Sequence, residues 1–308
     1  MIGGRRIFFR CWLPVLLVSW PVFVLGSPGP VTAQSPPTYE AMWVSSGPEV
    51  DGRLTEAVWS LVPWTRPFMD IRGEDWPAPT YDTRVKLLWD DDYLYVGAEL
   101  MEPHVWGTLS NRDAIIYRED DFEVFLDPGG DGLDYFEIEV NALGTVLDLF
   151  LDRPYGRGGR AKIDWDSPGL LVEVEVNGTL NDPSDRDVGW VVEMAIPWQD
   201  LVPPTGYSAP PGGTPPRGVP PAPGEKWRMN FSRVDWPLEI VPNPQSGGMT
   251  YRKSAEPTGQ RPHPEANWVW SPQGAINMHM PERWGTIRFQ GPNARSKSVS
   301  GPTPGGER

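Results

Sequence analysis

Cysteine and histidine are scarce in this 308-residue sequence. The single cysteine, Cys11, lies in the N-terminal leader described below, so we expect a mature chain without disulfides that depends on its hydrophobic core for stability. There are three histidines, and the sequence contains no Gly-x-Ser-x-Gly, His-Glu-x-x-His, phosphate-loop or Gly-x-Gly-x-x-Gly motif. These absences argue against a nucleophilic triad.

Long apolar runs are missing after residue 33. The preceding residues combine Arg5, Arg6 and Arg10 with an apolar run over 12–25 and a small-residue stretch that ends at Ala33. This pattern predicts a signal peptide over residues 1–33, and the paired arginines resemble a twin-arginine export signal. No later stretch approaches the roughly 20 apolar residues of a spanning helix. We therefore expect a secreted or periplasmic protein with no stable membrane span.

Basic residues are outnumbered in the rest of the chain. Without the three arginines of the leader, 24 Lys and Arg stand against 41 Asp and Glu, a formal net charge of −17. Such a surface repels nucleic acid and anionic membranes, and it suits neutral polar ligands or cations.

Short segments with strand periodicity are abundant. About ten of them, with hardly any helix beyond short turns, predict an all-β fold, a two-sheet antiparallel β-sandwich over residues 34–290. Within it, residues 203–223 contain nine prolines among 21 residues, which predicts a Pro/Gly-rich surface insertion. Residues 291–308 are predicted to be a disordered tail.

One predicted hairpin, over residues 117–141, carries a polar face. Apolar side chains alternate with acidic ones on both sides of a Pro-Gly-Gly-Asp-Gly turn, so one face can enter the core while the other carries Glu123, Glu137, Glu139 and Asn141, with Tyr117 just before it. We expect function on this face.

Three kinds of chemistry fit such a face. Glu123 and Glu139 could form the carboxylate pair of a glycoside hydrolase. The turn aspartates Asp127, Asp131 and Asp134 offer hard oxygen ligands for calcium, although their spacing does not match a calcium loop. A saccharide would instead need aromatic rings for its C–H faces and acceptors for its hydroxyls. With 16 tryptophans and nine tyrosines available, Tyr117 and Trp270 stand out because each adjoins a turn or a polar-faced strand.

Six segments, in this order, resemble the family 9 carbohydrate-binding modules of the DOMON-like superfamily. They are V-D-G-R-L-T-E-A-V-W (50–59), V-K-L-L-W-D-D-D-Y-L-Y-V-G-A-E (85–99), E-D-D-F-E-V-F-L-D-P (119–128), Y-F-E-I-E-V-N-A-L-G (135–144), W-V-V-E-M-A-I-P-W (190–198) and P-E-R-W-G-T-I-R-F (281–289).

The resemblance implies a non-catalytic β-sandwich that clamps a mono- or disaccharide between two rings. By position, the rings are Tyr117 and Trp270, and the polar contacts fall on Glu123 and Asn141; Glu139 and Arg233 are expected to line the site. Tyrosine stands here where the family's binders usually have tryptophan, and Glu139 where the best-known binders have a basic residue.

The resemblance leaves alternatives open. Some family members hold calcium, and the family usually accompanies a glycoside hydrolase, so a separate hydrolase is a candidate partner and an accessory role a candidate function. The same superfamily includes b-type haem domains for electron transfer, for which Met101, Met278, His279 and Met280 are the candidate ligands. We predict no cofactor, with calcium or haem as alternatives.

Overall fold

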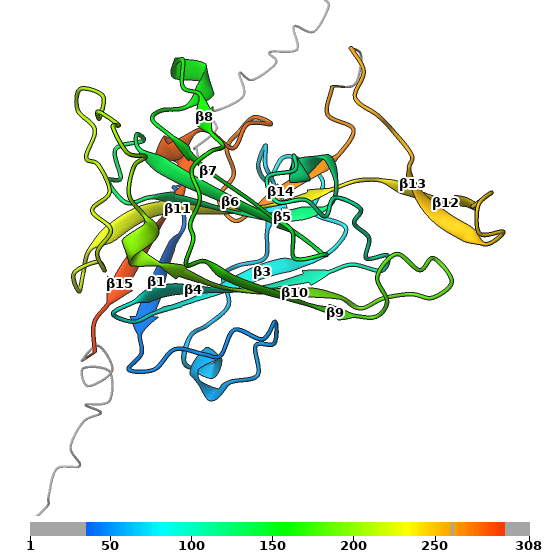
Figure 1. Ribbon diagram of the computed structural model, residues 1–308, viewed down its shortest axis with the longest axis horizontal. Helices are drawn as coiled ribbons and strands as arrows, with labels where there is room; N and C mark the ends of the chain where they lie inside the picture. The colour runs from blue at the N-terminus through cyan, green and yellow to red at the C-terminus, as the bar shows by residue number, and fades with distance from the viewer. Residues whose placement is uncertain (1–34, 260–261, 293–308) are drawn as a thin grey trace, which may run out of the picture. The chain divides into compact units, whose positions relative to one another are not determined.

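The structure is a computed structural model that describes residues 35–259 and 262–292. The described residues from Pro36 onward belong to one compact unit. The predicted leader and most of the predicted tail (293–308) lie outside the described residues. Within the described ranges the chain forms 15 strands and five 3-10 helices, with no α-helix (Figure 1). No described helix has the length and apolar character needed to cross a membrane.

The strands, in chain order, are β1 (Thr38–Trp43), β2 (Met69–Asp70), β3 (Thr83–Trp89), β4 (Tyr93–Met101), β5 (Asp121–Asp127), β6 (Tyr135–Asn141), β7 (Val146–Leu151), β8 (Ala161–Lys162), β9 (Leu171–Asn177), β10 (Gly189–Pro197), β11 (Lys226–Asp235), β12 (Leu238–Pro242), β13 (Met249–Lys253), β14 (Ala266–Val269) and β15 (Gly285–Gln290). The 3-10 helices are η1 (Ala57–Leu61), η2 (Ile116–Arg118), η3 (Tyr155–Arg157), η4 (Trp198–Asp200) and η5 (Pro281–Arg283).

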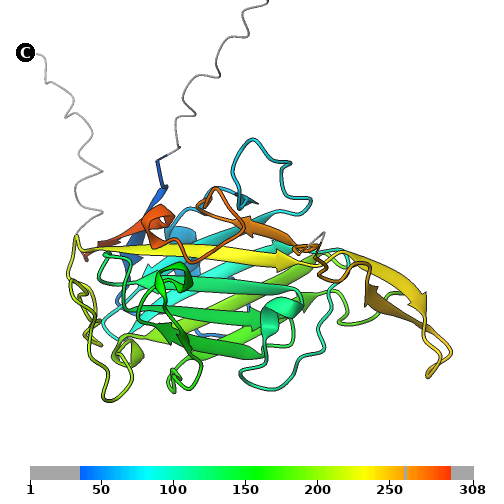
Figure 2. The same cartoon turned by 90° about the horizontal axis from the view of Figure 1, so that it is seen from above.

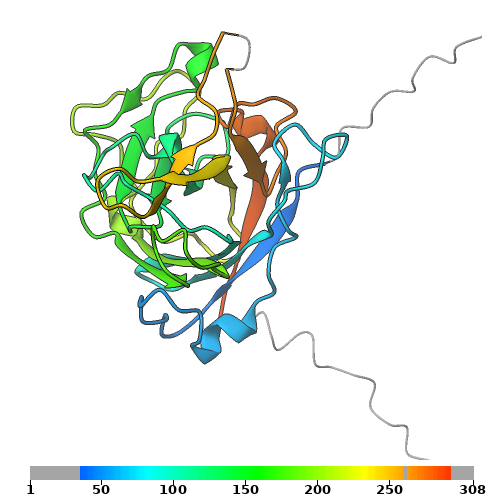
Figure 3. The ribbon, with the colours of Figure 1, turned by 90° about the vertical axis from the view of Figure 1, so that its right-hand side faces the viewer.

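Two layers of strands face each other. One contains β8, β7, β6, β5 and β11 in that order, and the other contains β1, β3, β4, β10 and β9 (Figure 1). Strand β15 connects the layers by pairing with both β11 and β1, so the sheet curls from one layer into the other (Figure 3). This is the predicted β-sandwich.

Two features differ from the prediction of an antiparallel sandwich of about ten strands. There are 15 strands among the described residues, and β1 lies between β15 and β3 and runs parallel to both. The strands that sequence periodicity missed are short or exposed; β12 and β13 pair only with each other and project beyond the layers (Figure 2). Residues 203–223 contain turns and coil without a strand, as proline-rich sequence predicts.

The main core lies between the layers. Phe122, Val124, Ile138 and Val140 point into it from β5 and β6, as the alternation predicts. The opposite face of these strands is also covered, since a second apolar cluster that includes Phe125, Leu147, Leu149 and Trp284 packs there. Strands β5, β6 and β7 are therefore buried on both faces, and the polar face of the hairpin is not an open surface.

Candidate functional site

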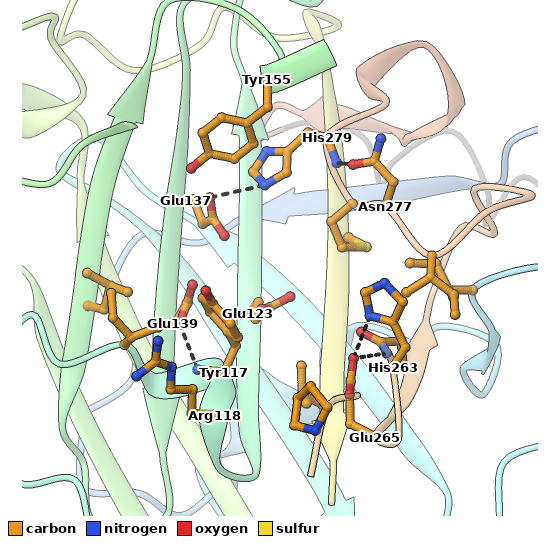
Figure 4. A pocket seen from close by; sticks show the side chains of 18 of the residues that line it. Tyr117, Arg118, Glu123, Glu137, Glu139, Tyr155, His263, Glu265, Asn277 and His279 are labelled. Atoms are coloured by element: carbon orange, nitrogen blue, oxygen red, sulfur yellow. Dashed lines mark hydrogen bonds and ion pairs between the residues drawn. The ribbon is translucent and has the colours of Figure 1, made fainter. Parts of the chain in front are cut away.

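A pocket of about 960 Å³ opens on the outer face of β5, β6 and β7 (Figure 4). The strands form its floor, and residues from η2 and η3, from 256–257, from 262–265 and from 276–279 form its walls. Its volume is that of a small-molecule site. Lining residues with polar or aromatic side chains are Tyr117, Arg118, Glu123, Glu137, Glu139, Tyr155, Trp236, Lys253, Glu256, His263, Glu265, Asn267, Asn277 and His279.

Carboxylates occupy the floor of the pocket. Glu123 on β5 lies directly opposite Glu139 on β6, and Glu137 lies two residues along on the same face. All three are at least 95% buried. Burial raises the pKa of Glu123 to about 7. The pKa values of Glu137 and Glu139 are also raised, mainly by burial and secondly by the negative charge of Glu123. The floor is thus an acid cluster held away from bulk water.

Two exposed tyrosine rings stand at the walls. Tyr117 is 49% exposed and Tyr155 is 46% exposed. The backbone N–H of Tyr117 donates to Glu139 Oε2 at 3.3 Å, and the indole N–H of Trp236 donates to the carbonyl oxygen of Tyr117 at 3.0 Å. These bonds fix the segment that carries the Tyr117 ring beside the floor.

His279 supports the other wall. Its ring lies 4.4 Å from the ring of Tyr155 in an edge contact, its Nδ1 lies 3.0 Å from the hydroxyl of Tyr135, and its Nε2 lies 4.0 Å from Glu137 (Figure 4). Burial lowers the pKa of His279 to about 4. The imidazole is therefore neutral at pH 7, and it positions Tyr155 and offers a polar edge without adding charge.

Comparison with known protein families identifies the family of this chain. The model of the "Carbohydrate family 9 binding domain-like" family matches residues 50–211, more than half of the 308-residue chain. The chain belongs to this family. The matched range contains five of the six segments on which the resemblance was drawn: 50–59, 85–99, 119–128, 135–144 and 190–198.

Curated relatives and solved structures are more distant. Exoglucanase XynX of Acetivibrio thermocellus is 25% identical over 168 residues, which cover 54% of this chain and 13% of that protein. Endo-1,4-beta-xylanase A of Thermoanaerobacterium saccharolyticum is 26% identical over 160 residues, covering 52% and 12%. The family 9-like domain thus spans only about an eighth of the curated relatives it matches.

Among solved structures, a candidate carbohydrate-binding protein from Bacteroides uniformis superposes with a TM-score of 0.53 at 16% identity, covering 83% of this chain and 100% of that one. A family 9 module from Caldicellulosiruptor kristjanssonii, solved with cellotriose, gives a TM-score of 0.47 at 18% identity and covers 83% and 96%. The first of these likenesses supports the β-sandwich fold.

The structure brings three of the predicted site residues together. Tyr117, Glu123 and Glu139 all line the pocket of the family 9-like domain. Strand alternation explains the acid pair, since residues opposite each other on neighbouring strands share a face.

The prediction that Trp270 stacks on a ligand is wrong. Its side chain is 1% exposed, it packs against Phe231 in the main core, and it is absent from the pocket. Alternation explains the burial: Val269 faces the second cluster, while Trp268 and Trp270 on either side of it face the main core.

Asn141 and Arg233 also lie outside the pocket. The Asn141 amide nitrogen donates to the carbonyl oxygen of Leu109, and its carbonyl oxygen accepts the N–H groups of Leu143 and Thr145, so it holds the turn into β7. Arg233 lies opposite Phe122 and points to the inner face, where it is fully buried.

The predicted calcium ligands do not converge. Asp127 accepts the backbone N–H groups of Gly130 and Gly132, both at 2.8 Å, and Asp131 accepts those of Leu133 and Thr214. Asp134 accepts a hydrogen bond from Tyr207. The group is not among the acid clusters of the described residues with oxygens close enough to share an ion. Asp127 and Asp131 instead accept backbone N–H groups of their own turn, and Asp131 and Asp134 also bond to the segment that contains Tyr207 and Thr214.

Only some of the candidate haem ligands suggested by the superfamily lie at the pocket. Met278 and His279 line the pocket, whereas Met101 is half exposed on β4 and does not. Haem binding stays an alternative to the predicted absence of a cofactor.

Glu137, Tyr155 and His279 are among the pocket residues that sequence reasoning did not name as saccharide contacts. Glu137 was predicted on the polar face of the hairpin, and it shares the parity of Glu139 on β6. No periodic signal points to Tyr155 or His279, since both belong to irregular segments that fold back over the sheet.

Proposed function

We propose that this domain binds a saccharide in the pocket without catalysing a reaction. The observation that carries the proposal is the arrangement of two exposed tyrosine rings, Tyr117 and Tyr155, above a floor of three carboxylates. Tyr155 takes the place first given to Trp270. Membership of a family of carbohydrate-binding domains supports the assignment.

The chemistry of a sugar matches these groups. Aliphatic C–H faces of a pyranose pack on aromatic rings, and its hydroxyls donate to carboxylates, with which hydrogen bonds are stronger than with neutral acceptors. Glu123, Glu137 and Glu139 supply the acceptors in this pocket. Affinity is expected to be modest, because a small polar ligand gives up strong hydration when it binds.

The position of the acids supports binding rather than hydrolysis. A glycosidase needs two carboxylates on opposite sides of the scissile bond. Glu123 and Glu139 project side by side from neighbouring strands of one floor, with oxygens within 4.8 Å of each other. A sugar resting on the tyrosines would meet both acids from the same side.

The setting of the domain is part of the proposal. The leader pattern in residues 1–33 supports secretion or a periplasmic location, and the curated relatives, an exoglucanase and an endo-xylanase, support a role beside a polysaccharide-degrading enzyme. The ligand would be a mono- or disaccharide unit, such as a chain end of a plant-type polysaccharide.

Calorimetric titration with glucose, cellobiose and xylobiose tests the proposal. We expect millimolar to micromolar binding by the wild type of at least one sugar, and loss of at least about 1 kcal/mol of binding free energy in Tyr117→Ala and in Tyr155→Ala. Trp76→Ala is the matched control, since Trp76 is 46% exposed but lies outside the pocket. Failure of the wild type to bind any of the three, or equal losses in all variants, would remove the pocket as a saccharide site.

A further inference from the structure

Three acid clusters occur among the described residues, and they differ in how their charge is balanced. They are Glu102, Asp120 and Asp235; Asp113, Asp148 and Asp166; and Asp121, Glu123 and Glu139. Arg233 forms ion pairs within the first, and Arg112 forms ion pairs with all members of the second. No ion pair among the described residues reaches the third, although Arg118 and Lys253 line the same pocket.

The third cluster has unused ligand atoms. Asp121 is fully buried and Glu123 is 5% exposed. Oδ2 of Asp121 and Oε2 of Glu123 have no hydrogen-bond partner among the described residues. Glu123 lies opposite Glu139 at the floor of the pocket (Figure 4). Asp121, two residues before Glu123 on β5, shares that face of the strand and lies opposite Asn141. In their charged form, two buried, unpartnered carboxylate oxygens beside a third carboxylate are costly unless a cation joins them.

The spacing of the oxygens fits one ion. One oxygen from each of Asp121, Glu123 and Glu139 lies within 4.8 Å of the other two. Calcium binds oxygen at 2.3–2.6 Å, so two oxygens on the same ion are at most about 5 Å apart. We propose that Asp121, Glu123 and Glu139 together form a binding site for one divalent cation of the calcium type at the floor of the pocket.

The surroundings favour calcium over magnesium. Three carboxylates from a rigid sheet offer an irregular donor set, and calcium accepts irregular coordination whereas magnesium demands a near-ideal octahedron. Calcium takes six to eight oxygens, so a site with three protein side chains keeps positions on its pocket side for water or for a sugar hydroxyl, while Glu137 stays a direct acceptor for the sugar. The net charge of the three acids and the ion would be −1. The site differs from the turn aspartates first considered for calcium, which the backbone already occupies.

The test measures the metal alone, without sugar. The full chain, stripped with chelator and exchanged into chelator-free buffer, is titrated with calcium chloride by calorimetry. We expect one site per chain with a Kd between about 10⁻⁵ and 10⁻³ M, in the range of extracellular and sensor sites. Glu123→Gln and Asp121→Asn should each weaken binding at least about tenfold.

Asp166→Asn is the matched control. It makes the same charge change in the cluster that Arg112 already balances, and it should bind calcium as the wild type does. In the presence of chelator, the Tm of the Glu123→Gln and Asp121→Asn variants should be no lower than that of the wild type, because each change removes like-charge repulsion. This measurement separates loss of the metal site from loss of the fold. The proposal is overturned if the wild type shows no calcium-dependent heat, or if Asp166→Asn loses as much affinity as Glu123→Gln.

Discussion

Replacement of Trp270 by alanine should lower the stability of the fold without changing the affinity for the saccharide. The ring is 1% exposed, packs 5.7 Å from the ring of Phe231, and rests against Gly285. Truncation of such a side chain typically costs about 3–5 kcal/mol through lost burial and the cavity left behind. In a domain of this size each kcal/mol lowers Tm by roughly 2–4 °C, so we expect a fall of roughly 6–20 °C.

Thermal unfolding followed by circular dichroism measures the effect, with Tyr117→Ala as the comparison. Tyr117 is half exposed, so its removal should cost about 1 kcal/mol or less, while it weakens sugar binding. Titrations well below the lower Tm should give Trp270→Ala the saccharide affinity of the wild type. If instead Trp270→Ala melts like the wild type and has lost its saccharide, the assignment of Trp270 to the core is wrong.

Further expectations follow from the same packing and charges. Gly285→Ala should destabilise by about 1–3 kcal/mol in urea titration, because a Cβ there would lie 2.2 Å from the Trp270 ring; an unchanged midpoint would contradict this contact. Arg233→Met should cost roughly 3–5 kcal/mol by leaving Glu102 without its ion pair, whereas an unchanged unfolding free energy would mean that Glu102 is already neutral. Burial raises the pKa of Asp127 in the folded protein to about 7, above the value of about 4 in the unfolded chain. Between these two pH values the folded protein binds more protons than the unfolded chain, so the contribution of Asp127 to stability falls as the pH rises from about 4 to about 7. Asp127→Asn should reduce this slope in urea titrations at pH 4.5 and 7.5, and identical slopes would refute it.

Strand periodicity carried most of the fold prediction. Alternating side chains on either side of Asp90-Asp91-Asp92 predict a hairpin over 83–89 and 93–100, and the structure has β3 at Thr83–Trp89 and β4 at Tyr93–Met101. Its alternation is local and its turn is short, so neighbouring residues suffice to define it. The position of β1 between β15 and β3 could not be predicted in this way, because parallel pairing joins chain segments some 250 residues apart and leaves no local signal.

The same distinction applies to the site. Alternation placed Glu123 and Glu139 on one face, and the register confirmed that they are opposite each other. Alternation could not say whether that face was open. The segments that cover it, including Tyr155 and His279, are irregular, and their position depends on packing against the sheet rather than on their own sequence pattern. Trp270 was misplaced for the related reason that aromatic residues serve equally as core and as ligand platforms.

A buried acid cluster is unfavourable for folding, but at the floor of the pocket it can favour the binding of a ligand or ion. The outer face of β5 and β6 could be packed with apolar side chains throughout, as Phe125 and Leu149 show on the same face. Instead Asp121, Glu123 and Glu139 keep carboxylates there, and no Lys, Arg or His of the described residues forms an ion pair with them. Protonation relieves like-charge repulsion and desolvation in such a cluster, and so does a cation that enters from the pocket; ligand hydroxyls can replace the lost hydration of the carboxylates. The stability of the empty domain and its affinity for an occupant are therefore linked, so variants that stabilise the empty form by neutralising these acids should bind less.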